Sequence, residues 1–119
     1  MRRHDERGAV TAETAMALPL LAVFALSAAW VVTLGVTQVR AVDAAREVAR
    51  SAARSDGPGQ ALAMGRRVAP GGSRVTVSVA NGEVRARVSS PVTPPLGLFG
   101  PWARIDLHAE AVAAQEPTQ

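Results

Sequence analysis

The sequence has no cysteine, no lysine and no tyrosine, and few aromatic residues of any kind. Without cysteine the chain can form neither a disulfide bond nor a thiolate metal site. All of its basic side chains are arginines, its formal net charge is only +3, and its aromatic residues are two Trp and two Phe. A nucleic-acid-binding domain normally needs a concentrated basic face together with aromatic stacking residues. The composition therefore indicates that nucleic acid is not a partner.

Charged residues are also missing from one long stretch, residues 14–39, which is rich in Leu, Val and Ala. As a helix rising about 1.5 Å per residue, it would be roughly 39 Å long. The hydrocarbon core of a bilayer is about 30 Å thick, so the stretch could cross a membrane with some tilt. Pro19 would remove one helical hydrogen bond, which membrane helices tolerate. A plain signal anchor or a cleaved secretory signal is the alternative, although secretory apolar regions usually have only about 7–15 residues.

One carboxylate, Glu13, lies just before this charge-free stretch. A charged side chain at the centre of a membrane helix costs about 2.5–3.5 kcal/mol, and less near the interface. One interpretation is that Glu13 caps the helix, with Thr11 or a neighbour as the N-cap, because acids favour the positive first turn. The other interpretation is that the chain is cut between Gly8 and Ala9, which frees a cationic amine. Glu13 could then hold the new N-terminus of another subunit.

The pattern of Gly8 ending a short basic leader, Glu13 five positions later and a long apolar helix resembles the class III signal of type IV prepilins. With a small C-terminal β region, the whole chain is similar to the TadE-like minor pilins of the tight-adherence (Flp) pilus system. The resemblance implies that a prepilin peptidase cuts after Gly8, that Ala9 becomes the N-terminus and that Glu13 docks subunits. Major Flp pilins are shorter and usually carry tyrosine directly after the glutamate, where this chain has Thr14. The resemblance therefore favours a minor pilin or pseudopilin.

The resemblance also implies partners and a location. The partners would be other pilin subunits, the prepilin peptidase, membrane lipid and the tight-adherence inner-membrane assembly machinery, whose ATPase acts from the cytoplasm. The chain would be a single-pass membrane protein with a cytoplasmic N-terminus and an extracytoplasmic C-terminal region, and could enter a pilus after assembly. Arginines in the leader agree with this orientation. Four arginines also follow the apolar stretch, so charge alone does not decide the orientation.

The predicted fold is α+β, with a leader over residues 1–8, a long helix over 9–55 with a membrane-spanning part at 14–39, and a small extracytoplasmic region over 56–119. In the outer part of the long helix, small residues recur every four positions and permit close packing; these are Ala41, Ala45, Ala49 and Ala53. We expect residues 42–53 to pack within the chain and residues 9–32 against other subunits. The turn residues 56–59 should end this helix. A short second helix should follow at 60–68, although Gly65 disfavours it.

Alternating apolar residues predict a three-stranded antiparallel sheet. The first strand carries Val75, Val77 and Val79 on one face, and the pair Asn81-Gly82 is typical of a two-residue hairpin turn. The second strand should continue the apolar face through Val84, Ala86 and Val88, and the third should cover residues 102–113. Residues 91–101 should form an irregular loop, and residues 114–119 a frayed tail. In the loop, Leu96, Leu98 and Phe99 should fill the core or, alternatively, form a contact patch.

Asp106, His108 and Glu110 alternate along the third predicted strand, so they should share one face. Such a trio could approach a metal ion, but polar side chains commonly alternate on a solvated strand face. No nucleophile and base can be combined into a catalytic site, since the chain has neither Cys nor Lys and only two His. We therefore expect no enzyme, no metal and no cofactor. The alternatives to a pilin are a signal-anchored extracytoplasmic binding module that never assembles, and a secreted enzyme or metal protein.

Overall fold

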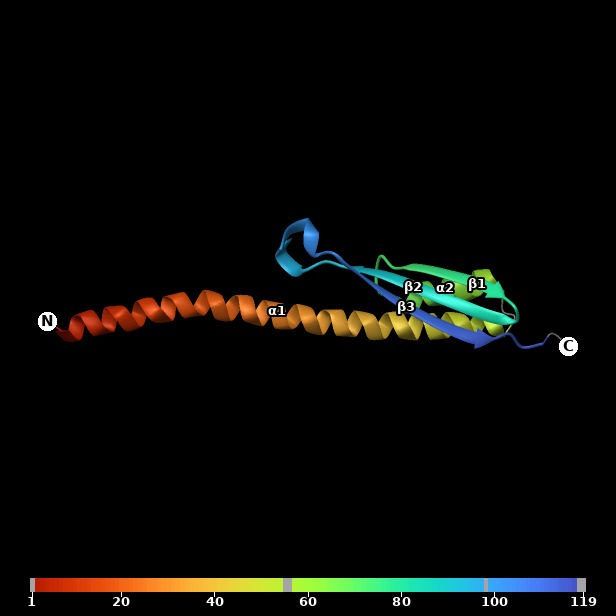
Figure 1. The fold of residues 1–119 in the computed structure, drawn as a ribbon, viewed down its shortest axis with the longest axis horizontal. Helices are drawn as coiled ribbons and strands as arrows, with labels where there is room; N and C mark the ends of the chain where they lie inside the picture. Colours follow the sequence, from red (N-terminus) through yellow and green to blue (C-terminus); the bar gives the residue numbers. More distant parts are fainter. Residues whose placement is uncertain (1, 55–56, 98, 118–119) are drawn as a thin grey trace. The chain divides into compact units, whose positions relative to one another are not determined.

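The computed structural model describes residues 2–54, 57–97 and 99–117. In these residues the chain forms two α-helices, three strands and two 3-10 turns (Figure 1). In chain order they are α1 (Arg2–Ala53), α2 (Pro58–Val68), β1 (Arg74–Ala80), β2 (Glu83–Val92), the turns Pro95–Gly97 and Gly100–Ala103, and β3 (Ile105–Ala114). The predicted α+β class is confirmed. The chain divides into two compact units, Met1–Val32 and Thr33–Gln119.

The first unit consists of the N-terminal part of α1, and most of its side chains are exposed. The hydroxyl groups of Thr11, Thr14 and Ser27 each donate a hydrogen bond to the carbonyl oxygen four residues earlier, over 2.8, 2.9 and 2.8 Å. These bonds satisfy the hydroxyls within the helix itself, which removes the penalty of placing them in apolar surroundings. Pro19 lies inside α1 and does not end it. These three hydroxyl groups therefore need no polar partner outside the helix.

The predicted limits of the long helix were wrong at its start, because α1 begins at Arg2 instead of Ala9. The leader has no proline, and Asp5 lies in the first turn, where an acid is favourable. At the other end α1 stops at Ala53, and the predicted last residue, Ser55, lies outside the described residues. The second helix starts earlier than predicted, at Pro58, since proline suits the first turn of a helix.

The three strands form one antiparallel sheet in the order β1-β2-β3. The predicted hairpin is confirmed, with Val77 opposite Ala86 and the turn at Asn81 and Gly82. These two turn residues have φ values of 53° and 76°, and positive φ at both positions is what this turn requires. On the other side of β2, Ala111 lies opposite Ala86. The apolar faces of all three strands are therefore aligned.

The second and third strands differ from their predicted limits. β2 continues through Pro91, where the sequence predicts a loop. β1 pairs with β2 only as far as Ser89, so Pro91 has a neighbouring strand on one side alone, the kind of edge position that proline tolerates. β3 begins at Ile105 instead of Trp102, because Gly100–Ala103 form a 3-10 turn. The predicted loop is therefore shorter and more structured than its sequence indicates.

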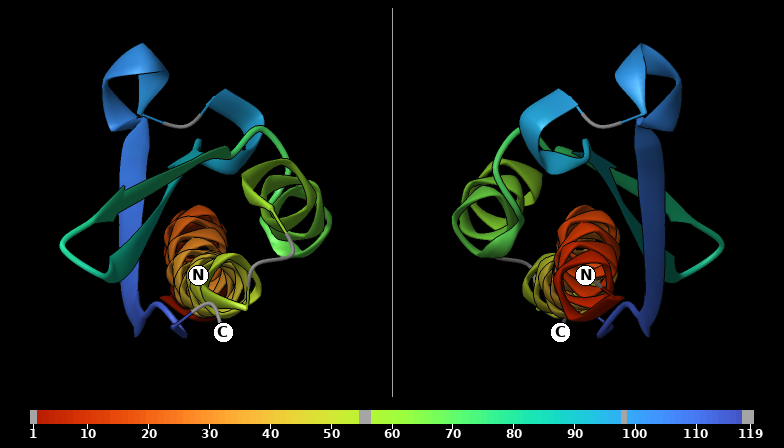
Figure 2. Two further views of the ribbon diagram at one scale, coloured as in Figure 1. Left: turned by 90° about the vertical axis from the view of Figure 1, so that its right-hand side faces the viewer. Right: turned by 90° about the vertical axis from the view of Figure 1, so that its left-hand side faces the viewer.

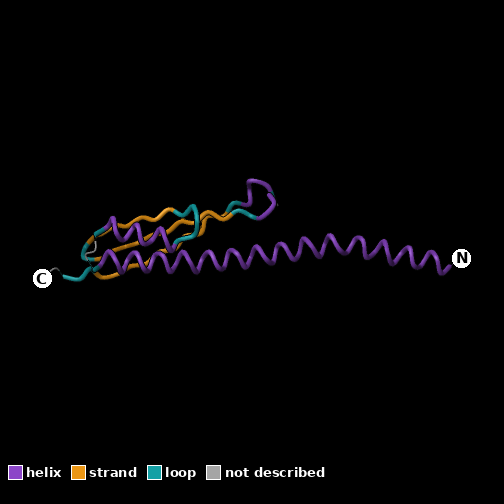
Figure 3. Tube along the Cα trace, turned by 180° about the vertical axis from the view of Figure 1, so that it is seen from behind, coloured by secondary structure: helices purple, strands orange, loops and turns teal. Residues whose placement is uncertain are grey.

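The last strand is tied to α1 at two places. The side-chain amide of Gln38 donates to the carbonyl oxygen of His108 over 3.3 Å. Beyond the strand, the N–H of Glu116 donates to the carbonyl oxygen of Ala53 over 3.3 Å. The prediction of a frayed tail is therefore wrong for the first residues after β3, while residues 118–119 lie outside the described residues. Between these two ties β3 runs alongside α1 (Figure 3).

Small side chains of α1 pack under the apolar face of the sheet, with α2 on the same face (Figure 2). The predicted ridge is buried along its whole length, with exposed fractions of 0%, 0%, 2% and 6% for Ala41, Ala45, Ala49 and Ala53. The core cluster comprises Ala41, Ala44, Ala45, Val48, Ala49, Ala61, Ala69, Val75, Ala86, Val88 and Ala109. Alanine allows the helix to lie close to the sheet. The predicted intramolecular packing of residues 42–53 is thereby confirmed.

The second helix meets α1 at Gly65, which is buried. A Cβ atom added there would overlap Cγ2 of Val48 and would lie 3.4 Å from Cγ1 of Val75. Val48 is itself fully buried in the core. Helix propensity alone makes Gly65 unfavourable, but the structure shows that the absence of a side chain lets α2 approach α1.

We expect Gly65→Ala to lower the free energy of unfolding by about 1–3 kcal/mol, because the added methyl group overpacks the core. The gain in helix propensity, about 1 kcal/mol, offsets only part of this loss. Circular dichroism during chemical denaturation of the detergent-solubilised chain measures the change. Gly59→Ala is the matched control in the same helix, since a Cβ at Gly59 meets nothing within 4 Å. Equal stability of the two variants would show that the close approach at Gly65 is wrong.

Candidate processing and docking site

The three residues singled out from the sequence, Gly8, Ala9 and Glu13, lie in the early turns of α1 and are exposed. Ala9 and Glu13 are four residues apart, so they share one face of the helix about 6 Å apart along its axis. A Cβ added at Gly8 would meet nothing within 4 Å. Packing inside the described part of this chain therefore does not require glycine at position 8.

The bond between Gly8 and Ala9 lies inside a continuous helix. A hydrogen bond from the hydroxyl of Thr11 to the carbonyl oxygen of Arg7, 2.8 Å long, spans this bond on the helix surface. Cutting a peptide bond that is part of a helix requires the helix to open locally first. Glycine favours that opening, because it is about 1 kcal/mol less favourable than alanine in a helix.

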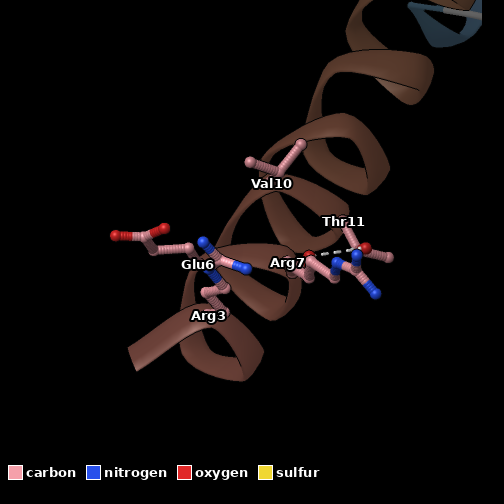
Figure 4. A pocket seen from close by; sticks show the side chains of 5 residues that line it. All are labelled: Arg3, Glu6, Arg7, Val10 and Thr11. Carbon is pink, nitrogen blue, oxygen red and sulfur yellow. Dashed lines mark hydrogen bonds between the residues drawn. The ribbon is translucent and has the colours of Figure 1, made fainter. Parts of the chain in front are cut away.

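A shallow hollow surrounds this segment, and Figure 4 shows the side chains that line it. They are Arg3, Glu6, Arg7, Val10 and Thr11. All of them come from the first turns of the same helix, and they fan outward from it. A hollow built by one helix face has no opposite wall. It therefore offers an exposed, charged segment to a partner but no enclosed ligand site.

Glu13 does not cap α1. α1 begins at Arg2, which places Glu13 and Thr11 in the helix interior, beyond the first turn where the dipole favours acids. The hydroxyl of Thr11 donates backward to a carbonyl oxygen and so does not act as an N-cap acceptor. Among the side chains that the structure describes, no salt bridge reaches Glu13. The capping interpretation is therefore wrong, and the docking interpretation stays a prediction.

The apolar stretch that follows Glu13 is not covered by the fold. α1 is the one helix within the described ranges that is long and apolar enough to cross a membrane, judged by length and composition. None of its most apolar window is buried. Leu20, Leu21 and Phe24, for example, are 70%, 61% and 72% exposed. A core helix of a soluble protein would be mostly buried, so this segment is compatible with a transmembrane helix.

The polar face of the sheet places Glu110 between two arginines. Nη2 of Arg87 lies 2.7 Å from its Oε2 atom, and Nη1 of Arg85 lies 2.9 Å from its Oε1 atom. The hydrogen bond from Arg87, together with the positive charges of both arginines, outweighs desolvation and lowers the pKa of Glu110. Asp106 pairs with Arg104, over 3.7 Å. In the described part of the chain, no three His, Asp or Glu side chains gather as metal ligands.

A second feature is the apolar loop, which we define as residues 93–104 between β2 and β3. Leu96 and Phe99 are 84% and 62% exposed, so the expectation that they fill the core is wrong, and Leu98 lies outside the described residues. Trp102 is 91% exposed. Trp102 lies in the 3-10 turn Gly100–Ala103 and not on the predicted strand, so the sequence pattern did not identify it as an exposed apolar residue. The signal that could have found it is the lack of any charged residue from 88 to 103, together with the prolines and glycines there.

Comparison of the chain with protein-family models, with curated proteins and with solved structures finds no match. The roles predicted for Gly8, Ala9 and Glu13 therefore rest only on their spacing, their exposure and the apolar helix that follows them.

We expect Glu110→Gln to lower the stability of the fold at neutral pH and low salt. The folded-state pKa of Glu110 is below its ordinary value of 4.5, so its carboxylate stabilises the fold above that value. This contribution is lost as the pH falls through the folded-state pKa. The difference between parent and variant should therefore be small but measurable at pH 7, because the pairs are exposed, and should vanish in acid.

Thermal unfolding of the parent protein and of Glu110→Gln, measured from pH 7 down to a pH below the folded-state pKa of Glu110, tests this expectation. Glu83→Gln is the control, since Glu83 takes part in none of the salt bridges found among the described residues. A difference that persists unchanged in acid would contradict the assignment to the two arginine pairs.

Proposed function

We propose that this protein is a minor pilin or pseudopilin subunit, of the TadE-like type, that takes part in assembling a tight-adherence (Flp) pilus. The observation that carries the proposal is an exposed apolar helix with one carboxylate, Glu13, placed between Gly8 and a stretch that the fold leaves uncovered. Such a helix needs lipid before assembly and neighbouring helices afterwards. The small α+β region, packed on α1 from Ala41 onward, supports the same architecture.

Glu13 would act through the amine that cleavage after Gly8 releases at Ala9. A carboxylate and an ammonium group attract each other much more strongly in a medium of low dielectric constant than in water. An unpaired carboxylate there is also costly, so a partner's amine relieves a penalty that the single chain carries. The exposure of Glu13, without a salt bridge to the described side chains, leaves it available for such a partner.

In this proposal the N-terminus is cytoplasmic and the α+β region is extracytoplasmic. A prepilin peptidase removes residues 1–8, and the tight-adherence inner-membrane machinery and other pilins are the assembly partners. The charged leader supports this orientation, because its arginines favour the cytoplasmic side.

The second candidate is a signal-anchored extracytoplasmic binding module that is not assembled into a filament. One observation favours it: α1 is continuous from Arg2, so the bond after Gly8 is not presented in an extended loop. In that case residues 1–8 stay attached, and the apolar helix serves only as an anchor.

The mature protein should begin at Ala9, and intact-mass measurement of the protein purified from its host tests this directly. Gly8→Val should keep residues 1–8 attached, because a branched side chain at the cut resists both local opening and close approach of a peptidase. Gly35→Val is the matched control in the same helix, since Gly35 also has open space around it, and it should be processed normally. A mature chain beginning at Met1 would support the anchor, and one beginning near Ala29 would indicate ordinary secretion.

Glu13→Ala should leave cleavage largely intact but weaken subunit association. Loss of one partner from a buried ion pair costs about 3–5 kcal/mol, which corresponds to roughly 100-fold weaker binding or more. Cross-linking of subunits in membranes, together with counting of surface pili, measures the defect. Asp43→Ala is the control, because Asp43 is an exposed acid on the outer part of α1. Normal assembly by the Glu13 variant would eliminate the pairing of amine and carboxylate.

A further inference from the structure

The apolar loop, residues 93–104, exposes three large side chains to solvent. Leu96, Phe99 and Trp102 are 84%, 62% and 91% exposed. Leu96 and Phe99 have φ values of 61° and 72°, in the left-handed region that bulky residues rarely adopt. Backbone strain of this kind clusters at functional segments. The loop therefore holds an apolar tip outward, away from the core under the sheet.

The position of the loop within the second unit follows from the two ties between β3 and α1. His108 is held at Gln38, whereas the residues after the strand are held at Ala53. The start of β3, at Ile105, therefore points toward the Thr33 end of this part of α1. The loop emerges from this end of the sheet, opposite the end at which β3 stops at Ala114 (Figure 1).

This end of the sheet coincides with the end of the charge-free stretch. Gln38 lies two residues before Arg40, the first charged residue after that stretch. The neighbouring valines of α1, Val36 and Val39, are 54% and 61% exposed. If α1 crosses a bilayer, Arg40 marks its outer boundary, and the loop lies on the lipid side of that boundary.

The charges around the loop favour lipid as its occupant. No charged residue lies between positions 88 and 103, and Arg104 is the first one after the tip. Arg74 and Arg104 line the same surface hollow at this end of the sheet, together with Asp106. At a membrane interface, apolar side chains lie deepest, tryptophan lies nearer the headgroups, and arginines reach the lipid phosphates. The apolar tip, Trp102 and the two arginines follow this order.

We propose that the apolar loop inserts Leu96, Phe99 and Trp102 into the outer interface of the membrane that α1 spans, with Arg74 and Arg104 at the level of the lipid headgroups. The loop is then a second membrane contact, which fixes the depth and the tilt of the α+β region. This inference rests on the membrane span proposed above, but it is independent of cleavage after Gly8 and of pilus assembly.

The test uses the full chain in vesicles of phosphatidylcholine and phosphatidylglycerol. The protein has two tryptophans, so Trp30→Phe leaves Trp102 as the only one. The emission of Trp102 should shift to the blue relative to the unfolded chain. It should lose intensity in vesicles whose lipids carry bromine near the headgroup end of the acyl chain, and lose less when the bromine lies deeper. Aqueous iodide should quench it weakly.

Two further variants make the outcome decisive, with circular dichroism confirming that each one folds. Trp102→Phe keeps Trp30, which lies in the apolar stretch and should be quenched by brominated lipid if α1 spans. The triple variant Trp30→Phe/Trp102→Phe/Ala80→Trp places the reporter in the exposed hairpin end, where iodide should quench it and brominated lipid should not.

Quenching of Trp30 without quenching of Trp102 would overturn the loop proposal while leaving the membrane span intact. Absence of quenching at both positions would overturn the span as well. A blue-shifted Trp102 that brominated lipid does not quench would also overturn the proposal, because the loop would then be covered by this chain or by a second copy of it and not by lipid.

Discussion

An apolar helix that its own fold leaves uncovered is the constraint on which the rest of this molecule depends. Each fully buried Val, Leu or Phe side chain contributes about 1.5–3 kcal/mol, and here no residue in the most apolar window of α1 is buried in the chain itself. The missing burial has to come from lipid or from other proteins. The short leader and Glu13 lie directly before this uncovered segment, which is why the proposed function assigns roles to them.

The part of the same helix from Ala41 onward has one face buried by the chain itself. From Ala41 onward small side chains lie against the sheet, and Gly65 on α2 has no side chain where Val48 needs the space. Close approach of this kind excludes water without large side chains, which suits a region that has few of them. Arg40 lies between the exposed apolar part of α1 and the part that packs against the sheet. The helix is thus a transmembrane candidate at one end and a core element at the other.

The local patterns predicted much of this fold. The alternation of apolar residues and the pair Asn81-Gly82 predicted the hairpin. Both signals are local, since the alternation follows from strand geometry and positive φ depends on the two turn residues themselves. Tertiary choices were harder to predict. Pro91 predicted a loop, but it lies in β2, where β1 no longer pairs with that strand and the proline is at an edge of the sheet. Trp102 fitted the alternation of the third strand, but it lies in a 3-10 turn. The start of α1 was predicted wrongly because Ala9 is a chemical boundary, and nothing in the leader breaks a helix.

The helical leader gives Gly8 a conformational role if the chain is cut there. A peptidase needs the backbone to open, and the first turns of a helix open most easily because their N–H groups lack intrahelical partners. Gly8 lies just beyond those turns, and nothing in the chain packs on it. Opening as far as Gly8 therefore breaks few bonds, whereas opening farther would disturb an apolar segment that lipid would keep helical, since unsatisfied backbone groups are costly there. The proposed cut lies between the helix turns that open easily and the apolar segment that lipid would keep helical. A peptidase could therefore reach the bond after Gly8 without unfolding the membrane helix.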